Sequence, residues 1–465
     1  MITLGSSVCL PGFKPKYNHA QQVQYVNKQA SKSNSINMGS STHYYDTFNP
    51  YAKPGKIAPG ATILLFETLI TQTADDITCF YPQLAQTLHI KKQTLSMTLN
   101  PLARFSDQTK VTTADVVHSY HLAKQHPLYV EALKDLSLHI ESNRLVWHYS
   151  NLTATLLALA KMPIIKHSEA LIGSGPYFVN KASSTQIQYQ KNDLFWAENL
   201  WLNIGRNNFK HVNFHLNVKP FQNLNALSQG KIDWFLEHNA HRWDQIITSA
   251  NIQKTTLAQP LSEYTLYLRI NPQLDYKTRQ FIAHSINFDK INQALCHGFY
   301  TAKKYQAPTP LEAITRHKPI KLLTQGAQWT PAAQAICHQL EASNIPCIHA
   351  LKHPIAYQQA VKTGAYDLII EPMLITPSMQ LSDLFPHYLN ETSPQSTEQN
   401  AHERLEQLIQ SYLCIPMWTN KQFRIVHNKA IHLDHLNHLE HIDWQAMWKT
   451  RELTNSISSH DEDSV

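Results

Sequence analysis

Glycine is scarce in this chain, with only 12 among 465 residues, so the places where two glycines stand together are informative. Cysteine is sparse as well, and none of the six cysteines forms a CxxC pair or has zinc-finger spacing. No uninterrupted apolar run reaches the length that a membrane-spanning helix needs. The formal net charge is +6 but the basic residues are scattered, which argues against binding to DNA or RNA.

The cysteines lie at positions 9, 79, 296, 337, 347 and 414, and we expect buried, unpaired thiols. An oxidising compartment would allow disulfides instead, and Cys337 and Cys347 are then the nearest pair. The first residues, MITLGSSVCLPGFKPKYN, have neither the basic region nor the apolar region of a signal peptide. Either the protein stays in the cytoplasm, or the given start lies inside or after such a peptide.

Sequence motifs of hydrolytic enzymes are missing. There is no GxSxG, and HERLE at 402–406 ends in Glu where a zinc metalloprotease needs a second His. Histidine is abundant, with 27 residues, and is densest in HLDHLNHLEHIDW at 432–444. Four histidines at intervals of three drift around a helix, and leucines repeat with the same period, so we interpret this segment as packed leucines with solvated histidines. We therefore expect no catalytic site, no metal site and no cofactor.

The pattern of apolar residues divides the chain into two parts that differ in the order of their expected helices and strands. Segment 110–127 predicts a helix, because Thr112 can cap its start and Asp115 stands three residues later. Strands and helices are mixed in the first half, and 277–295 is expected to be one helix. From 319 to 372, strands and helices alternate as βαβαβ, which predicts a parallel sheet with crossover helices. Two architectures in one chain predict two lobes.

Two of the few glycines flank Ser174 in GSGPYFV, at 173–179. Glycine is favoured where φ must be positive or where another backbone comes close, and we expect a sharp turn from Gly173 to Gly175. Pro176 fixes φ at the point where a strand is expected to begin. A phosphate-binding loop is a poor alternative, because no GK[ST] and no helix follow.

Several of these segments together resemble the extracellular solute-binding proteins of family five, the peptide-, dipeptide- and nickel-binding partners of ABC importers. The resemblance runs from about residue 36 to 450 and is carried by FETLITQ, YPQLAQTL, GSGPYFV and, most specifically, ARFSDQTKVTTADVVHSYHL. LFWAENLWLNIGRNNFKHV and WFLEHNAHRWDQI are similar to a subgroup associated with oligopeptide and microcin C uptake. The chain departs from the family pattern at Asp107-Gln108, where an Asp-Gly turn is usual, and in TPSMQLSD at 376–383.

The resemblance implies an α/β fold of the two-lobed periplasmic binding protein type II, with a two-strand hinge. Lobe I, of mixed α/β structure, would take residues 36–262 and 416–450, and lobe II, with the βαβ repeats, would take 263–415. YTLYLRINP and CIPMWTNKQFRIV would cross between them. Residues 1–35 are expected to be a poorly ordered lead-in and 451–465 a disordered acidic tail.

By the same resemblance, the protein would be a non-enzymatic, monomeric, periplasmic component of an ABC importer. It would bind an oligopeptide or a peptide-like solute between the lobes and deliver it to an inner-membrane permease with ATPase subunits. A nickel- or metallophore-binding protein and a non-transport sensor are the alternatives. The candidate ligand-binding residues are Phe48, Asn49, Glu67, Thr68, Glu237, His238, Trp243, Tyr264, Asp383 and Trp418.

Overall fold

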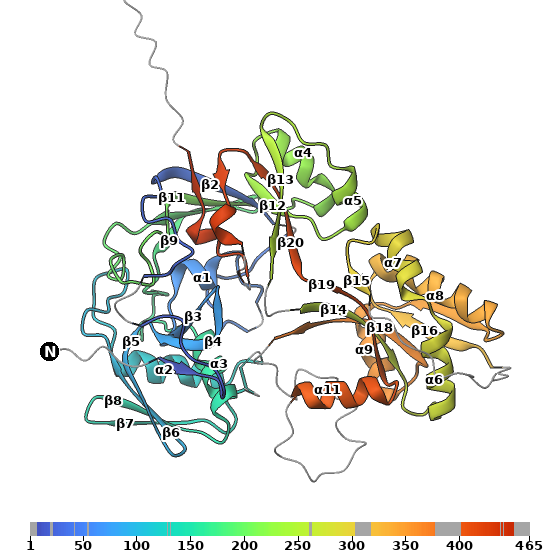
Figure 1. Ribbon diagram of the computed structural model, residues 1–465. Coiled ribbons are helices and arrows are strands. Elements are labelled where there is room, and N and C mark those ends of the chain that lie inside the picture. Colours follow the sequence, from blue (N-terminus) through green and yellow to red (C-terminus); the bar gives the residue numbers. More distant parts are fainter. Residues whose placement is uncertain are drawn as a thin grey trace, which may run out of the picture.

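Two lobes lie side by side in the computed structural model, as the alternating and mixed patterns predict (Figure 1). The structure describes residues 7–18, 22–40, 42–53, 55–127, 129–130, 132–259, 263–302, 318–376, 401–437, 439 and 441–450. Among these residues, no helix is long and apolar enough to cross a membrane. Asp383 and the expected acidic tail fall outside the described residues.

A seven-stranded sheet forms one part of lobe I, in the order β13-β20-β12-β2-β11-β10-β9. Parallel pairing with β11 and β12 places β2 at the centre of this sheet. Its strands are β2 (Ser33–Gly39), β9 (Tyr177–Ala182), β10 (Gln186–Lys191), β11 (Phe209–His215), β12 (Trp234–Leu236), β13 (Ile252–Ala258) and β20 (Gln422–Asn428). Two short helices, α4 (Asn223–Ser228) and α5 (Ala240–Gln245), flank β12 in the sequence.

Two smaller antiparallel sheets complete lobe I, together with the β21–β22 pair (Ile431–His432 and Trp448–Lys449). One consists of β1 (Val8–Cys9), β3 (Ile70–Thr73) and β4 (Asp76–Pro82). The other consists of β5 (Ala85–Lys91), β6 (Thr94–Leu99), β7 (Ser137–Glu141) and β8 (Arg144–His148). The helices here are α1 (Ala61–Leu65), α2 (Thr113–Lys124) and α3 (Leu152–Lys161). The predicted start of α2 is confirmed, since Asp115 Oδ2 accepts a hydrogen bond from the Thr112 backbone N–H at 2.8 Å.

Lobe II is built on one six-stranded sheet, in the order β15-β19-β14-β18-β16-β17. The βαβαβ prediction is confirmed, because β16 pairs in parallel with both β17 and β18. The strands are β14 (Glu263–Ile270), β15 (Thr301–Ala302), β16 (Ile320–Thr324), β17 (Cys347–Leu351), β18 (Leu368–Ile375) and β19 (Cys414–Asn420). The helices are α6 (Tyr276–Ser285), α7 (Phe288–Cys296), α8 (Thr330–Ala342), α9 (Pro354–Thr363) and α11 (Ala401–Gln410).

The prediction of a single helix at 277–295 is wrong in one respect, because the chain forms two helices there, α6 and α7. Ile286 has an extended backbone, and the side chain of Asn287 then caps α7 by accepting from the Lys290 backbone N–H at 2.9 Å. Asn is a strong helix N-cap residue, and this capping preference wins over the continuing apolar period.

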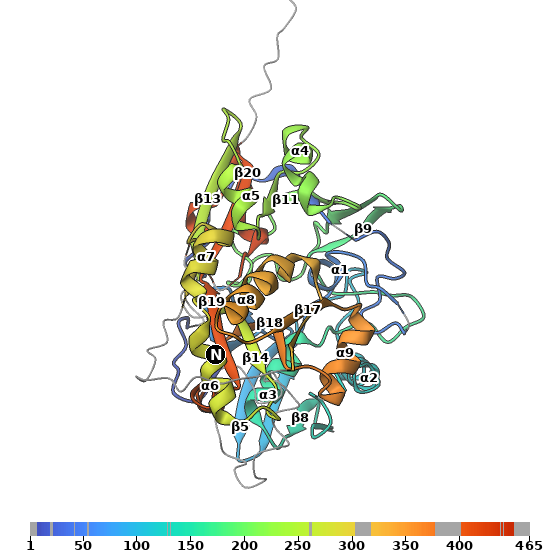
Figure 2. The ribbon, with the colours of Figure 1, turned by 90° about the vertical axis from the view of Figure 1, so that its right-hand side faces the viewer.

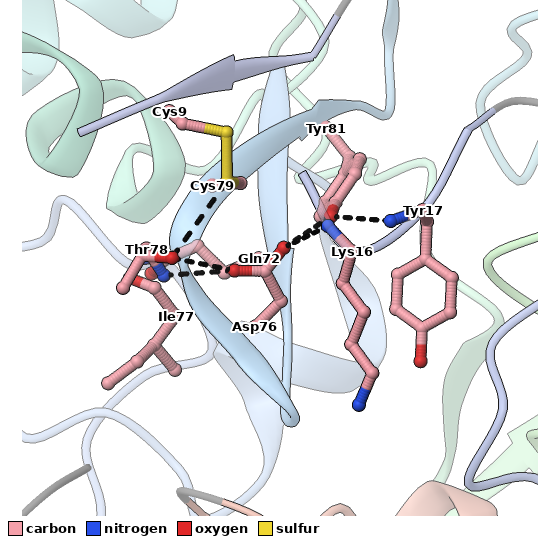
Figure 3. Close-up of a disulfide and its surroundings, with 9 residues drawn as sticks. All are labelled: Cys9, Lys16, Tyr17, Gln72, Asp76, Ile77, Thr78, Cys79 and Tyr81. Atoms are coloured by element: carbon pink, nitrogen blue, oxygen red, sulfur yellow. Dashed lines mark hydrogen bonds between the residues drawn. A yellow bond between two sulfur atoms is a disulfide. The ribbon is translucent and has the colours of Figure 1, made fainter. Parts of the chain in front are cut away.

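The expectation of a poorly ordered lead-in is also wrong, because residues of the first 35 pack into lobe I. Tyr17 is buried, and β1 pairs with β4 so that Cys9 lies opposite Cys79. These two cysteines form a disulfide (Figure 3). Beside it, the Lys16 backbone N–H donates to Asp76 Oδ2 at 3.1 Å. A segment that looks polar in sequence is therefore attached through a few buried side chains.

The expectation of unpaired thiols is wrong for four of the six cysteines. Cys9 is joined to Cys79, and Cys337 is joined to Cys347, the pair nearest in sequence. Cys296 and Cys414 are free. A disulfide stabilises mainly by restricting the unfolded chain, typically by about 2–4 kcal/mol.

The histidine-rich segment packs as expected around its leucines. Leu433, Leu436 and Leu439 are buried in the core of lobe I. A 3-10 turn at Asp434–Leu436 takes the place of a regular helix. His432 stacks on Trp448 with ring centroids 3.8 Å apart, so its ring serves packing. Among the described residues, no group of three or more His, Cys, Asp or Glu could hold a metal ion.

Close approach of another backbone, and not a positive φ, explains the paired glycines. Neither Gly173 nor Gly175 has a positive φ. A Cβ atom on Gly173 would overlap the carbonyl oxygen of Leu65, and one on Gly175 would overlap that of Leu64. The Gly175 backbone N–H donates to the Leu65 carbonyl at 2.9 Å. The glycines thus allow the segment that leads into β9 to pack directly against the backbone at the end of α1.

We predict that Gly173→Ala destabilises the protein by about 3 kcal/mol, because overpacking against backbone leaves no flexible atom to move aside. Urea unfolding followed by circular dichroism measures the change. Gly326→Ala is the matched control, since an added Cβ there meets only the carboxamide end of the Gln328 side chain. Equal losses in the two variants would contradict this explanation of the paired glycines.

Candidate functional site

The chain crosses between the lobes along a two-stranded ribbon. β13 pairs with β20 in lobe I, and β14 pairs with β19 in lobe II, so both connections lie next to each other. The Gln259 backbone N–H donates to the Lys421 carbonyl at 2.8 Å, and the Lys421 ammonium is ion-paired with Glu263. Figure 1 shows this ribbon between the two lobes. The lobes can therefore rotate about one narrow connection.

A row of side chains lies at the end of the lobe II sheet nearest this ribbon. Tyr264 is the register partner of Asn420 on one side and of Leu374 on the other. Tyr264 is 42% exposed and Leu374 is 52% exposed, whereas Leu266, two residues further along β14, is buried. We call Asn420, Tyr264 and Leu374 the Tyr264 row. It presents an aromatic and an aliphatic side chain beyond the edge of the lobe II core.

Trp418 supports this row from within the core. It pairs with Leu266 on β14 and with Ala302 on β15, and it is buried. The Thr265 and Thr419 hydroxyls, on the opposite face of these strands, are 2.9 Å apart. Partial burial raises the pKa of Tyr264. The Tyr264 phenol therefore stays neutral at physiological pH and can donate a hydrogen bond.

A second set of residues joins the lobes directly. Arg424 on β20 is buried, and its Nη2 donates to the Phe299 carbonyl at 3.2 Å. Its guanidinium lies 4.8 Å from the centroid of the Tyr300 ring. The Tyr300 hydroxyl donates to the His238 carbonyl at 3.0 Å. We call Arg424 and His238 of lobe I, with Phe299 and Tyr300 of lobe II, the lobe contact.

Glu237 shapes the backbone beside the lobe contact. Its carboxylate is buried, pairs with the Arg242 guanidinium at 2.7 Å and accepts from the Asn239 backbone N–H at 2.8 Å. These bonds fix the turn from β12 into α5. Partial desolvation lowers the pKa of His238, and the neighbouring Glu237 carboxylate opposes that shift.

Glu67 and Thr68 are bonded inside lobe I, away from the Tyr264 row. Trp196 Nε1 donates to Glu67 Oε2 at 2.7 Å, and the Thr68 hydroxyl donates to the Ile70 carbonyl at 2.7 Å. Burial raises the pKa of Glu67 to about 8, although hydrogen bonds from Trp196 and Gln83 favour the carboxylate. Glu67 is thus a protonated, interior acid at neutral pH.

Three further candidate residues also make contacts within lobe I. Phe48 packs edge-on against Tyr189, with ring centroids 6.3 Å apart. Asn49 Oδ1 accepts from the Tyr51 backbone N–H at 2.9 Å, which holds the loop after it. Trp243 is buried under the Lys254 ammonium, 4.7 Å from its ring centroid.

The ten candidate residues therefore do not form one cluster. Tyr264 and Trp418 lie on neighbouring strands of lobe II and Glu237 is next to His238, whereas five residues are held inside lobe I and Asp383 falls outside the described residues. Their role as ligand contacts stays a prediction. Arg424, Phe299, Tyr300 and Leu374 were not among the candidates. For Phe299 and Tyr300 the sequence offers one signal, the glycine of CHGFY at 296–300, which marks a chain reversal just before them.

The sequence profile of the bacterial extracellular solute-binding proteins, family 5 (middle region), matches residues 80–319. The chain belongs to this family. The protein YejA of Escherichia coli is 27% identical over 327 residues, which are 63% of this chain and 52% of YejA. The probable peptide-binding protein YejA of Agrobacterium fabrum is 23% identical over 317 residues, covering 59% of this chain and 50% of that protein. This family 5 chain spans about half the length of the curated relatives it matches.

Solved structures of two-lobed binding proteins share the fold. NikA from Brucella suis, in complex with Fe(III)-EDTA, superposes with a TM-score of 0.72 at 13% identity, covering 90% of this chain and 100% of NikA. AppA from Bacillus subtilis, in complex with a nonapeptide, superposes with a TM-score of 0.65 at 13% identity, covering 91% and 100% of the two chains. The family 5 protein thus has the type II periplasmic binding protein fold, which confirms the predicted fold class.

The buried Glu67 predicts a pH dependence of stability. Its folded-state pKa is about 8 against an ordinary value of 4.5, so the stability it contributes is present below pH 4.5 and is lost as the pH rises towards 8. A tenfold difference in proton affinity between the folded and unfolded states corresponds to about 1.4 kcal/mol, so wild type should lose on the order of 3 kcal/mol relative to Glu67→Gln between pH 5 and pH 8. Urea unfolding at both pH values measures this difference, with the exposed Glu169→Gln as control. A parallel pH dependence in wild type and Glu67→Gln would contradict the assignment.

Proposed function

We propose that this protein is the substrate-binding component of an ABC importer, and that it captures oligopeptides or peptide-like solutes between its lobes. The observation that carries the proposal is the exposed Tyr264 row, which lies beside the two-stranded connection of a family 5 fold. Exposed apolar side chains at a lobe boundary are characteristic of surfaces that a ligand covers. On this proposal the protein changes its shape around the solute and performs no chemistry on it.

Rotation about the ribbon would bring lobe I against the Tyr264 row and a bound solute. A ligand shifts an open–closed equilibrium only by its difference in affinity for the two states, so contacts from both lobes are required. Tyr264 and Leu374 would supply apolar contacts from lobe II, and the backbone near the end of β18 would pair with an extended peptide. Water-filled side-chain pockets would then give weak sequence selectivity.

The partners follow from the same proposal. A substrate-binding component would deliver its solute to an inner-membrane permease driven by ATPase subunits, and it would work as a monomer in the periplasm. The two disulfides support an oxidising compartment, because disulfides persist there and are rare in the cytosol. The peptide-binding name of the A. fabrum relative and the nonapeptide in AppA support peptides as the solute class.

Binding of mixed tri- to decapeptides to the purified protein tests the proposal. A ligand that binds only the folded state should raise the unfolding temperature, since a concentration 100 times Kd adds about 2.7 kcal/mol of stability. Tyr264→Ala should weaken peptide binding roughly tenfold in calorimetry, because it removes a central aromatic contact. Tyr276→Ala, an exposed tyrosine at the start of α6, is the matched control.

Other outcomes would change the proposed ligand, the proposed site or the proposed role. A thermal shift with nickel or a nickel chelate and none with peptides would favour the metallophore alternative, for which NikA has the same fold. Equal affinity in Tyr264→Ala and Tyr276→Ala would remove the Tyr264 row from the binding site. Cleavage of any peptide would overturn the non-enzymatic role.

A further inference from the structure

Two histidines from different lobes meet beside the lobe contact. His241 lies on α5 in lobe I, and His297 follows the last residue of α7 in lobe II. Figures 1 and 2 both place α5 next to α7. His241 Nδ1 is 3.0 Å from His297 Nε2, and the rings are stacked with an interplanar angle of 21°. This is a direct hydrogen bond between imidazoles.

The neighbouring side chains determine where the protons of this pair lie. Gln245 Nε2 is 2.8 Å from His241 Nε2, and an amide nitrogen can only donate, so His241 Nε2 accepts. His241 then carries its proton on Nδ1 and donates it to His297 Nε2. The remaining proton of a neutral His297 is on Nδ1, which faces Asp244 Oδ2 at 3.9 Å. The bonds therefore run in one direction, from Gln245 through both imidazoles towards Asp244.

Protonation of both imidazoles breaks this chain, whereas a single added proton would be shared between the two facing nitrogens. With His241 Nδ1 and His297 Nε2 both protonated, two N–H groups would face each other at hydrogen-bonding distance, and neither nitrogen could accept. Protonating both rings would also place two positive charges in stacked contact. Imidazoles change charge between about pH 5 and pH 8, so this contact is sensitive to pH in a range that other side chains rarely reach.

The other charged groups near the pair are bound to partners of their own. Arg242 is held by Glu237, and Arg424 lies on the rings of Phe299 and Tyr300. Burial raises the pKa of Cys296 to about 11 and also raises that of Tyr300, so both stay neutral. Desolvation lowers the pKa of His238, so its neutral form is favoured. Asp244 favours a charged His297, and it is exposed, with its Oδ2 3.9 Å from His297 Nδ1.

We propose that His241 and His297 form a pH-sensitive latch between the lobes, which is released when both imidazoles are protonated. The Arg424 and Tyr300 bonds of the lobe contact do not depend on these protons and would keep the lobes joined there. As a regulator of solute capture the latch rests on the proposed function, because lobe rotation is the step that it would restrain. Its existence is independent of what the solute is.

Small-angle X-ray scattering of the ligand-free, full-length protein at pH 8 and pH 5, at constant ionic strength, tests the latch. Wild type should shift to a larger radius of gyration at pH 5. His297→Asn should have the same radius at both pH values, and asparagine suits the left-handed backbone at this position, where φ is 51°. His121→Asn, which removes an exposed histidine of α2, should behave as wild type.

Imidazole ¹⁵N shifts of histidine-labelled protein give a second, independent readout, with signals assigned by comparison with His241→Asn and His297→Asn. At pH 8, His241 should be protonated on Nδ1 and His297 should accept at Nε2. An unchanged radius in wild type, a pH-dependent radius that persists in His297→Asn, or an Nε2-protonated His241 at pH 8 would each overturn the latch. Because no ligand is present, these outcomes are separate from success or failure of peptide binding.

Discussion

The whole molecule depends on one two-stranded ribbon. β13 pairs with β20 in lobe I, and β14 pairs with β19 in lobe II, so the strands that lead from one lobe to the other are held together on both sides. The Lys421–Glu263 ion pair lies across them. A ribbon this narrow resists stretching but permits rotation and twist, so the arrangement of the lobes is set by the few contacts beside it. Solute capture by rotation, as proposed here, needs this combination.

Each lobe is held together by a different kind of packing. In lobe I, Gly173 and Gly175 allow their segment to pack directly against the backbone at the end of α1. Just after α1, the carboxyl group of Glu67 is buried and accepts a hydrogen bond from Trp196. In lobe II, parallel pairing around β16 buries one apolar strand after another between helices. The change of shape proposed here would therefore be confined to the boundary between the lobes. The Tyr264 row, the lobe contact and the histidine pair all lie there.

Local patterns predicted much of the fold. The Thr112–Asp115 pair marked the start of α2, and the βαβαβ alternation marked the sheet of lobe II, because capping and periodicity are properties of neighbouring residues. The break between α6 and α7 was missed, since Asn287 competes with an apolar period that continues through it. The polar first 35 residues concealed Tyr17 and Cys9, whose burial depends on partners about 60 to 70 positions away.

Taken alone, the sequence determined the division into a mixed part and an alternating βαβ part, the crossing strands and the family resemblance, since each of these depends on contiguous segments. Only the tertiary structure decided which side chains share a surface. It placed Leu374 beside Tyr264, enclosed Glu67 under Trp196 within lobe I, paired Cys9 with Cys79 and brought His241 to His297. The physical reason is that these contacts join residues 56 to 129 positions apart. Their meeting depends on strand register and on how the lobes are set against each other, which no local pattern encodes.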